Sequence, residues 1–312
     1  MFFFEQISLS TWIVFITVIV GLMILNEIGR YSKITGIMSF VIVPIILSIF
    51  VWPRTSGPGT GVQTANWFQW VKTYSALAGC IIFMALRYSK KVQSKKWFYL
   101  LVPGILAINI LEAVIREIEI VNLSGVIDGM TYIGGNWNYL NAAAGILNML
   151  TICGWSGIII SKNKQKDMIW PDMCWFWIIA YDIWNFAYVY NCVTDRALYS
   201  GLGLLLAATI PAFTIKKGAW LQHRAQTLAF WMMIVMTFPN ILATGQHAIQ
   251  SAHNPTAYYT ISIISLLANF AVAIYQVRTI IKNHKNPLRD DIYTELETYK
   301  KVKEENIEVY VK

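Results

Sequence analysis

Long apolar runs dominate the chain and predict membrane-spanning helices. Nine mostly apolar stretches follow one another between Thr11 and Val277. Each has about the 17–25 residues that a helix needs to cross a hydrocarbon core roughly 30 Å thick. Lipid offers no partner to a free backbone N–H or C=O, so each run is expected to be an α-helix. The predicted fold class is therefore all-α, a polytopic transmembrane helical bundle of about nine spans. The predicted spans are Thr11–Asn26, Ile37–Trp52, Trp67–Leu86, Trp97–Ile118, Tyr139–Ile160, Trp170–Cys192, Tyr199–Ile215, Gln226–Ile249 and Tyr258–Val277.

Basic residues are segregated between the gaps that separate these runs. Of the 25 Lys and Arg residues, 21 lie in every second gap or in the C-terminal tail, and the four exceptions are Arg54, Lys72, Arg116 and Arg196. Lys and Arg accumulate in the cytoplasmic loops of membrane proteins. The pattern therefore predicts an N-terminus outside and a C-terminus inside.

Composition supports a membrane protein with one domain. The chain is 56% hydrophobic and 13% charged, with a mean hydropathy of +0.49, which is unusual for a soluble domain. We expect one transmembrane helical domain, residues 1–281, followed by a cytoplasmic polar tail, residues 282–312. The net charge of +8 comes from short clusters at helix ends. It predicts membrane lipids as partners and argues against nucleic acid. An oligomer is compatible with the sequence.

No motif in the sequence predicts a cofactor, a metal site or a catalytic residue. The four cysteines are scattered within the spans without C-x-x-C spacing, so we interpret them as packing residues. H-E-x-x-H, G-x-S-x-G and Walker A sequences are absent. A retinal Schiff base would need a lysine deep in the last span, where the first lysine is Lys282. These observations lean against an enzyme.

Candidate chemistry lies in polar side chains at membrane depth, because such residues are costly in lipid and face protein or water. The fourth span carries Asn109, Glu112, Arg116 and Glu119 on one helical face. The i, i+4 spacing of Glu112 and Arg116 predicts an ion pair between them. This stripe either joins helices through a buried ion pair or lines a polar cavity.

The sixth span places Asp182 and Asn185 on one face among Trp and Tyr residues. A carboxylate in such surroundings has three interpretations. It is a protonatable group, an acceptor for Tyr and Trp donors, or part of a site for an organic cation bound by cation–π attraction.

Further polar residues mark the fifth and eighth spans. Asn141 lies on a polar face of the fifth span, where interhelical hydrogen bonds would explain it without a solute. In the eighth span we expect Pro239 to kink the helix next to Asn240 and His247. His247 would serve either as a proton shuttle or as a hydrogen-bonding core residue.

Several long aromatic motifs resemble a family of uncharacterised bacterial polytopic inner-membrane proteins, classified as a domain of unknown function. The motifs are Phe50-Val51-Trp52-Pro53, Thr73–Cys80, Ile105–Glu117, Trp175–Cys192 and Lys216–Ala229. The resemblance implies a multi-pass protein of the bacterial cytoplasmic membrane. It brings no reaction, ligand or functional residue.

These observations predict a bundle whose polar faces enclose a cavity open toward the outside. The leading function is a transporter or channel for an unidentified small polar or ionic solute, with Asp182, Glu112 or His247 as candidates for proton coupling. One alternative is an integral-membrane enzyme acting on a lipid or isoprenoid substrate. Another is a structural or sensor protein whose buried polar network only holds helices together. The predicted binding residues are Asp182, Asn185, Asn109, Glu112, Arg116, Asn240, His247 and Asn141.

Overall fold

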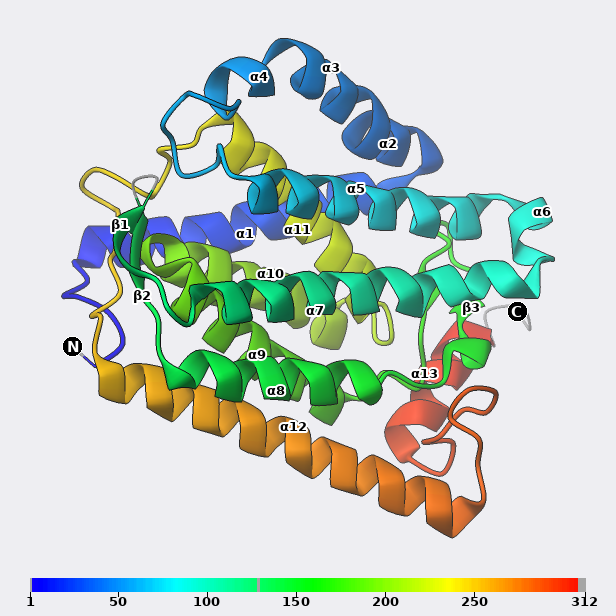
Figure 1. The fold of residues 1–312 in the computed structure, drawn as a ribbon. Helices are drawn as coiled ribbons and strands as arrows, with labels where there is room; N and C mark the ends of the chain where they lie inside the picture. Colours follow the sequence, from blue (N-terminus) through cyan, green and yellow to red (C-terminus); the bar gives the residue numbers. More distant parts are fainter. Residues whose placement is uncertain (1, 128–129, 308–312) are drawn as a thin grey trace.

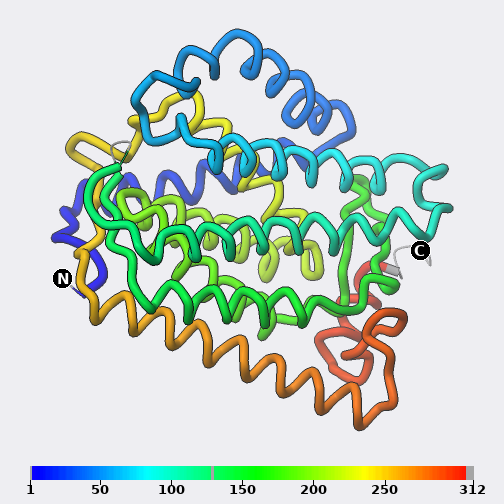
Figure 2. Tube along the Cα trace, viewed as in Figure 1, coloured from blue at the N-terminus to red at the C-terminus, as the bar shows by residue number. Residues whose placement is uncertain are grey.

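Long helices lying side by side make up most of the molecule. The computed structural model describes residues 2–127 and 130–307. Figure 1 shows the longest helices running roughly along one direction, with the segment from α2 to α4 slanting across one edge of the bundle. The trace in Figure 2 places the start of α1 and the last helix, α13, at opposite ends of the bundle. The predicted all-helical class is confirmed for the described residues, apart from two small hairpins.

The elements follow in chain order. The α-helices are α1 (Leu9–Tyr31), α2 (Lys33–Ile37), α3 (Val43–Phe50), α4 (Trp52–Thr55), α5 (Trp67–Tyr88), α6 (Lys90–Gln93), α7 (Leu101–Ile120), α8 (Asn136–Leu150), α9 (Trp175–Cys192), α10 (Leu204–Thr214), α11 (Trp220–Thr237), α12 (Pro255–Asn283) and α13 (Glu297–Ile307). Shorter 3₁₀ or π turns are η1 (Met38–Ile42), η2 (Lys96–Leu100), η3 (Trp155–Gly157), η4 (Thr194–Arg196) and η5 (Ala197–Gly203). The strands β1 (Ser124–Ile127) and β2 (Met130–Ile133) form one antiparallel hairpin, and β3 (Ile159–Ile160) and β4 (Met168–Ile169) form the other.

Six helical segments of the described chain are long and apolar enough to cross a membrane. They are Leu9–Tyr31, Lys33–Phe50, Trp67–Tyr88, Lys96–Ile120, Thr194–Thr214 and Pro255–Asn283. Several of them expose rows of large apolar side chains. On α1, for example, Ile13, Ile16, Val20 and Ile24 are all exposed. Large exposed apolar surfaces are rare on soluble proteins, so these segments make the molecule a plausible membrane protein.

The other three predicted spans correspond to α8, α9 and α11, which do not meet the same criterion of length and apolarity. Most side chains of α9 and α11 are buried inside the bundle. A helix surrounded by other helices does not face lipid, so it tolerates Asn, His and Arg at positions where a lipid-facing helix would not. The count of nine spans and their orientation therefore stay predictions.

Two of the predicted spans were drawn too long. The fifth was expected to reach Ile160, but α8 ends at Leu150, and the chain turns through the left-handed Gly154 into η3 and β3. The eighth was expected to continue past a kink at Pro239, but α11 ends at Thr237. Proline has no N–H to continue the helical hydrogen bonds. Here it ends the helix instead of bending it.

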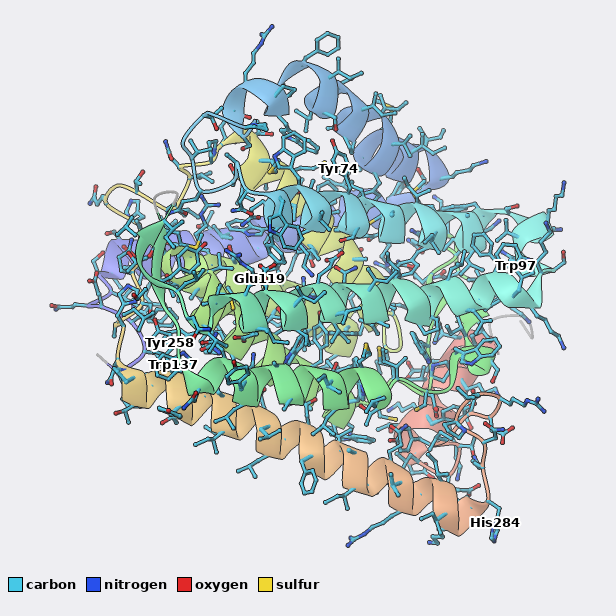
Figure 3. The ribbon with its side chains drawn as sticks, in the orientation of Figure 1. Tyr74, Trp97, Glu119, Trp137, Tyr258 and His284 are labelled. Atoms are coloured by element: carbon cyan, nitrogen blue, oxygen red, sulfur yellow. The ribbon has the colours of Figure 1, made fainter. Side chains whose placement is uncertain are left out.

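Side-chain packing fixes how the helices meet. The rings of Trp137 on α8 and Tyr258 on α12 stack with centroids 5.1 Å apart, at the end of the bundle where both helices begin (Figure 3). Trp97, in the η2 turn that precedes α7, lies at the other end of the bundle.

The side chain of Asn66 caps the start of α5, where it accepts a hydrogen bond from the Gln69 backbone N–H at 3.0 Å.

The C-terminal tail folds back onto the bundle. After α12, the side chains of Ile292 and Tyr293 are buried, and their backbone N–H groups donate to Asp172 at 2.8 and 2.7 Å. The helix α13 follows. Of the predicted polar tail, residues 308–312 lie outside the described part of the chain, as do Asp128 and Gly129.

Candidate functional site

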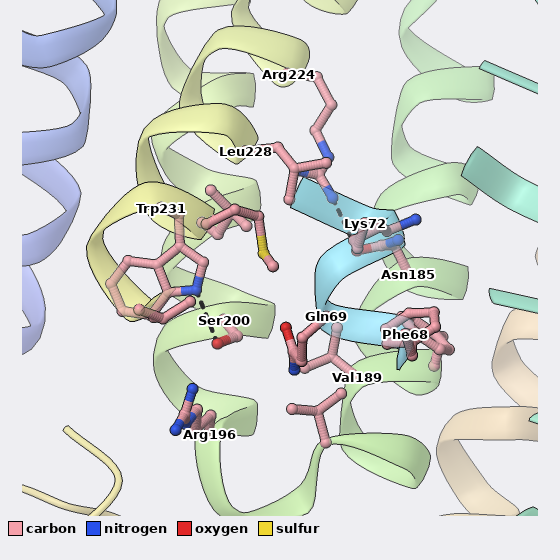
Figure 4. Close-up of a pocket in the computed structure, with 15 residues that line it drawn as sticks. Phe68, Gln69, Lys72, Asn185, Val189, Arg196, Ser200, Arg224, Leu228 and Trp231 are labelled. Atoms are coloured by element: carbon pink, nitrogen blue, oxygen red, sulfur yellow. Dashed lines mark hydrogen bonds between the residues drawn. The ribbon is translucent and has the colours of Figure 1, made fainter. Parts of the chain in front are cut away.

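A cavity lies inside the bundle between α5, α9, α11 and the segment from η4 to α10. The space between its lining residues is about 500 Å³, part of it open to solvent, and about 50 Å³ of it admits the centre of a water-sized molecule. Much of its wall is apolar and includes Phe68, Val189, Leu228 and Trp231 (Figure 4). These elements are neighbours in the bundle, since α5 packs against α11 and α9 packs against the η5 turn.

Three basic side chains also line this cavity, which is the feature that sets it apart. Lys72 comes from α5, Arg196 from η4 and Arg224 from α11. Only 7%, 2% and 5% of their respective surfaces are exposed. Figure 4 shows Lys72 and Arg224 toward one end of the cavity and Arg196 toward the other, with Gln69 between them. No Asp or Glu is among the described residues that line it.

Lys72 has a carboxylate partner outside the cavity lining. Its Nζ lies 3.2 Å from Oε2 of Glu112 and donates to the backbone carbonyl of Asn109 at 2.9 Å. The Ser75 hydroxyl donates to the same carboxylate oxygen at 3.2 Å. Asn109 and Ser75 line a second, smaller cavity of about 340 Å³ that shares Arg224 with the first.

Arg224 has few partners for a buried guanidinium. Its Nη2 donates to Oδ1 of Asn185 at 3.2 Å, and the guanidinium also interacts with the Tyr181 side chain, whose ring centroid lies 6.0 Å away. Its Nε and Nη1 atoms are buried without a hydrogen-bond partner. A buried polar group that lacks a partner loses the hydrogen bonds it had in water.

Arg196 is similar. Its Nη2 donates to the backbone carbonyl of Pro239, and its Nε is buried without a partner. The neighbouring Asp195 accepts hydrogen bonds from Gln63 and from the Thr131 N–H, both at 3.2 Å, and forms no ion pair with Arg196 among the residues that the structure describes.

The predicted ion pair between Glu112 and Arg116 is wrong. Glu112 turns toward α5 and pairs with Lys72. Arg116 instead lies 3.0 Å from Glu119, one turn further along α7, and donates to the Tyr132 hydroxyl at 2.9 Å. The i, i+4 spacing permits the pair, but the partners on neighbouring elements determine where each side chain points.

Asp182 and Asn185, predicted together in the sixth span, separate in the structure. Asn185 lines the cavity and binds Arg224. Asp182 accepts a hydrogen bond from Thr209 on α10 at 2.7 Å, and Trp220 donates to the same hydroxyl at 3.0 Å. Asp182 is not among the residues lining the cavity. Its other carboxylate oxygen is buried without a partner.

A second polar centre surrounds Glu117, which the sequence analysis left outside the stripe on α7. Its carboxylate is fully buried and accepts hydrogen bonds from three amide groups. Asn138 donates at 2.5 Å, Asn141 at 2.6 Å and Asn191 at 3.1 Å. Ser265 on α12 donates to Asn141 in turn at 2.6 Å. The predicted site residue Asn141 therefore belongs to an interhelical network that joins α7, α8, α9 and α12.

The two predicted site residues of the eighth span lie in the loop after α11. Asn240 is exposed there. His247 is half-buried, with its Nδ1 3.3 Å from the Thr11 hydroxyl, and its backbone carbonyl accepts from the Tyr199 hydroxyl at 2.7 Å. Neither residue is among those lining the cavity.

A third centre lies in the loop between β3 and β4, which the predicted orientation places in the cytoplasm. Asp167 is fully buried and accepts hydrogen bonds at 2.8 Å from Arg30, Gln222 and Asn163. Burial alone would raise the pKa of Asp167. The hydrogen bond and positive charge of Arg30, helped by the two amide donors, outweigh burial and lower that pKa to about 2.

The cavity cations had a signal in the sequence. Lys72 and Arg196 are two of the four basic residues that depart from the segregation of Lys and Arg. A basic residue on the predicted external side runs against the positive-inside rule, so such departures suggest a function. Arg224 showed no such departure. It lies in the same gap as Lys216 and Lys217, where the predicted orientation already expects basic residues. Among residues 2–127 and 130–307, no group of three or more His, Cys, Asp or Glu side chains is placed to hold a metal ion.

The fold and these centres define a predominantly helical protein with several helices of membrane-spanning length. Residues 5–305 match a family described as a family of unknown function (DUF5692), and the chain belongs to that family. No curated protein and no solved structure matches it. The resemblance to an uncharacterised family is thus confirmed over nearly the whole chain. The match does not say where the family resides or what it does.

Proposed function

We propose that this protein is a transporter or channel that passes a small polar or ionic solute across a bacterial inner membrane. In this proposal the cavity between α5, α9, α10 and α11 is the solute site. The observation that carries it is the set of buried basic side chains Lys72, Arg196 and Arg224 around an empty volume inside an apolar bundle. Charged groups at membrane depth are expensive and mark solute or ion pathways.

The proposal keeps nine spans with the N-terminus outside and the C-terminus inside, supported by the segregation of basic residues. In this orientation α9 runs from the cytoplasm outward. The cavity then extends from Asn185, near the middle of α9, past Val189 to Arg196 just beyond its outer end. That direction agrees with a solute site reached from outside.

Proton coupling, where it occurs, is assigned to Glu112. Of the three residues predicted for this role, Asp182 binds Thr209 and His247 binds Thr11, whereas Glu112 contacts the cavity residue Lys72 directly. A change in the charge of Glu112 would change the number of free positive charges at the cavity.

Tracer uptake into liposomes tests the proposed transport. Purified protein is reconstituted and offered a panel of labelled carboxylates, phosphate, amino acids and organic cations. We expect at least one solute to enter faster than in protein-free liposomes. Leu228→Trp should reduce that uptake at least tenfold. Leu228 lines the cavity, so the larger indole would occupy space that the solute needs.

Leu111→Trp is the matched control, since Leu111 is exposed on α7 and is not among the residues lining the cavity. Both variants are first checked for an unchanged size-exclusion profile. Equal uptake by the two variants, or no uptake of any panel member, would remove the support for transport through this cavity.

Reporter fusions test the orientation. A reporter at the C-terminus should be active in the cytoplasm, and one inserted at Gly59 should report the outside. The opposite result at either position would exclude the proposed topology.

A further inference from the structure

Positive charges outnumber negative ones around the cavity, and this excess indicates which sign of charge a bound solute would carry. Three cations line it, and one carboxylate, that of Glu112, contacts them. Asp182 and Asp195 attract Arg224 and Arg196 through space. Neither forms an ion pair with them among the described residues, because Asp182 binds Thr209 and Asp195 binds Gln63 and Thr131.

The unpaired donors belong to the two arginines. Nε and Nη1 of Arg224 and Nε of Arg196 are buried and donate to no protein atom in the described chain. Arginine stays charged under all ordinary conditions, so these groups cannot relieve the imbalance by losing a proton. A buried guanidinium without a counter-charge is strongly unfavourable, and an anion beside it removes that penalty.

The remaining surroundings also disfavour a cation. The Asn185 side-chain oxygen is already used by Arg224, and the Gln69 side-chain amide offers both an acceptor and a donor, so it favours neither sign of charge. The Ser200 hydroxyl accepts from the Trp231 indole N–H at 2.9 Å. A cation in the cavity would meet three positive charges, whereas an anion would find free N–H donors.

We propose that the solute of this cavity is a small anion with a carboxylate or phosphate group, held by Arg224 and Lys72 and attracted by Arg196. Its apolar part, where it has one, would lie against Leu228 and Trp231. This inference rests on the cavity being the solute site. Carboxylate and phosphate share the oxygen acceptors that suit guanidinium donors.

Ligand-dependent thermal unfolding of the purified protein in detergent tests the proposal. The probes are butyrate, glycerol phosphate and inorganic phosphate, with tetraethylammonium as the cationic comparison, all at constant ionic strength. A ligand that binds only the folded state raises the unfolding midpoint in proportion to ln(1 + [L]/Kd). We expect at least one of the anions to stabilise the protein and tetraethylammonium to have no effect.

Two variants locate the effect. Arg224→Met should weaken the apparent affinity at least tenfold, whereas Arg116→Met, the same change at a basic residue outside the cavity, should leave it unchanged. Asn185→Asp provides a second variant of nearly the same shape. Its carboxylate would lie beside Arg224 as a built-in counter-charge, so the protein should be at least as stable as wild type without ligand and lose its response to anions.

The outcomes separate this inference from the proposed transport. Anion binding that depends on Arg224, without uptake in liposomes, would support the anion site and reject transport. Uptake of a cation or neutral solute with no anion response would support transport and reject the anion site. Stabilisation that survives both Arg224→Met and Asn185→Asp would place the anion elsewhere and overturn the proposal.

Discussion

Glu117 and Arg224 are both buried ionisable residues in the same bundle, but they differ in how many of their polar atoms have a hydrogen-bond partner. The Glu117 carboxylate accepts hydrogen bonds from three asparagine side chains. Arg224 donates to Asn185 at 3.2 Å and contacts the Tyr181 side chain, while its Nε and Nη1 are buried without a hydrogen-bond partner. Glu117 lies where four helices pack together, and Arg224 lies at the edge of an empty volume.

The difference indicates different roles. A buried polar group whose partners are all supplied by the protein fixes the arrangement of the helices that supply them. A buried group whose partners are missing costs stability unless something outside the chain provides them. By this reasoning we interpret the Glu117 network as structural and propose the Arg224 cavity as a ligand site. The predictions below test the comparison, beginning with the largest expected effect.

Removing the Glu117 carboxylate should be strongly destabilising. Glu117→Leu leaves three amide donors facing an apolar side chain, and we expect the unfolding free energy to fall by on the order of 3–5 kcal/mol. Thermal or denaturant unfolding in detergent measures the change. Arg224→Met is the matched comparison, and without added anion it should stay within about 1 kcal/mol of wild type, because an unpaired buried charge is replaced by an apolar group. Equal losses in the two variants would contradict the distinction between the two centres.

The contact between Lys72 and Glu112 should behave as an interhelical ion pair. Glu112→Met leaves the ammonium with only the Asn109 carbonyl and should lower the unfolding free energy by about 3 kcal/mol. Adding Lys72→Met should recover most of that loss, since both charges are then gone.

Arg116→Met is the control for this pair. Because Arg116 pairs with the exposed Glu119, the change should alter stability by less than about 1 kcal/mol and should not couple to Glu112. A double variant of Lys72 and Glu112 no more stable than the single ones would show that these two residues do not act as a pair.

The centre around Asp167 should make the stability of the protein depend on pH. Burial opposes ionisation of Asp167, but Arg30 and two amides hold its folded pKa at about 2, below the unfolded value of 3.8. A depressed pKa contributes stability that is present above about pH 4 and is lost as the pH falls toward 2. The contribution is about 2 kcal/mol, from just under two pKa units at about 1.4 kcal/mol each. The unfolding midpoint of wild type should therefore approach that of Asp167→Asn between pH 4 and pH 2. A constant difference between the two over this range would mean that Asp167 does not titrate there.

How much of the fold followed from the sequence depends on what each helix faces. The ends of α1, α5, α7 and α12 were predicted to within six residues. A long helix with an apolar surface forms its backbone hydrogen bonds within itself, so it can be recognised without reference to its neighbours. The ends of α8 and α11 were missed. The chain leaves the helix before the left-handed Gly154 in one case and before Pro239 in the other. Hydropathy alone does not show where within an apolar run a helix ends.

For the candidate site, the sequence likewise indicated some of the residues but not the contacts between them. The sequence alone determined which polar residues lie inside apolar runs, and it pointed to Asn185, Glu112 and Asn109 near what became the cavities. It also marked Lys72 and Arg196 as departures from the segregation of basic residues, although it gave them no role.

Only the tertiary structure decided which of these groups meet. Spacing along α7 suggested that Glu112 pairs with Arg116, yet Glu112 reaches Lys72 on another helix and Arg116 reaches Glu119. The sequence sets the face of a helix on which a side chain lies, since that depends on local geometry. The partner of that side chain depends on how helices distant in the sequence pack. The same packing decides whether a buried ionisable group finds all its partners in the protein, as Glu117 does, or keeps unpaired donors, as Arg224 does.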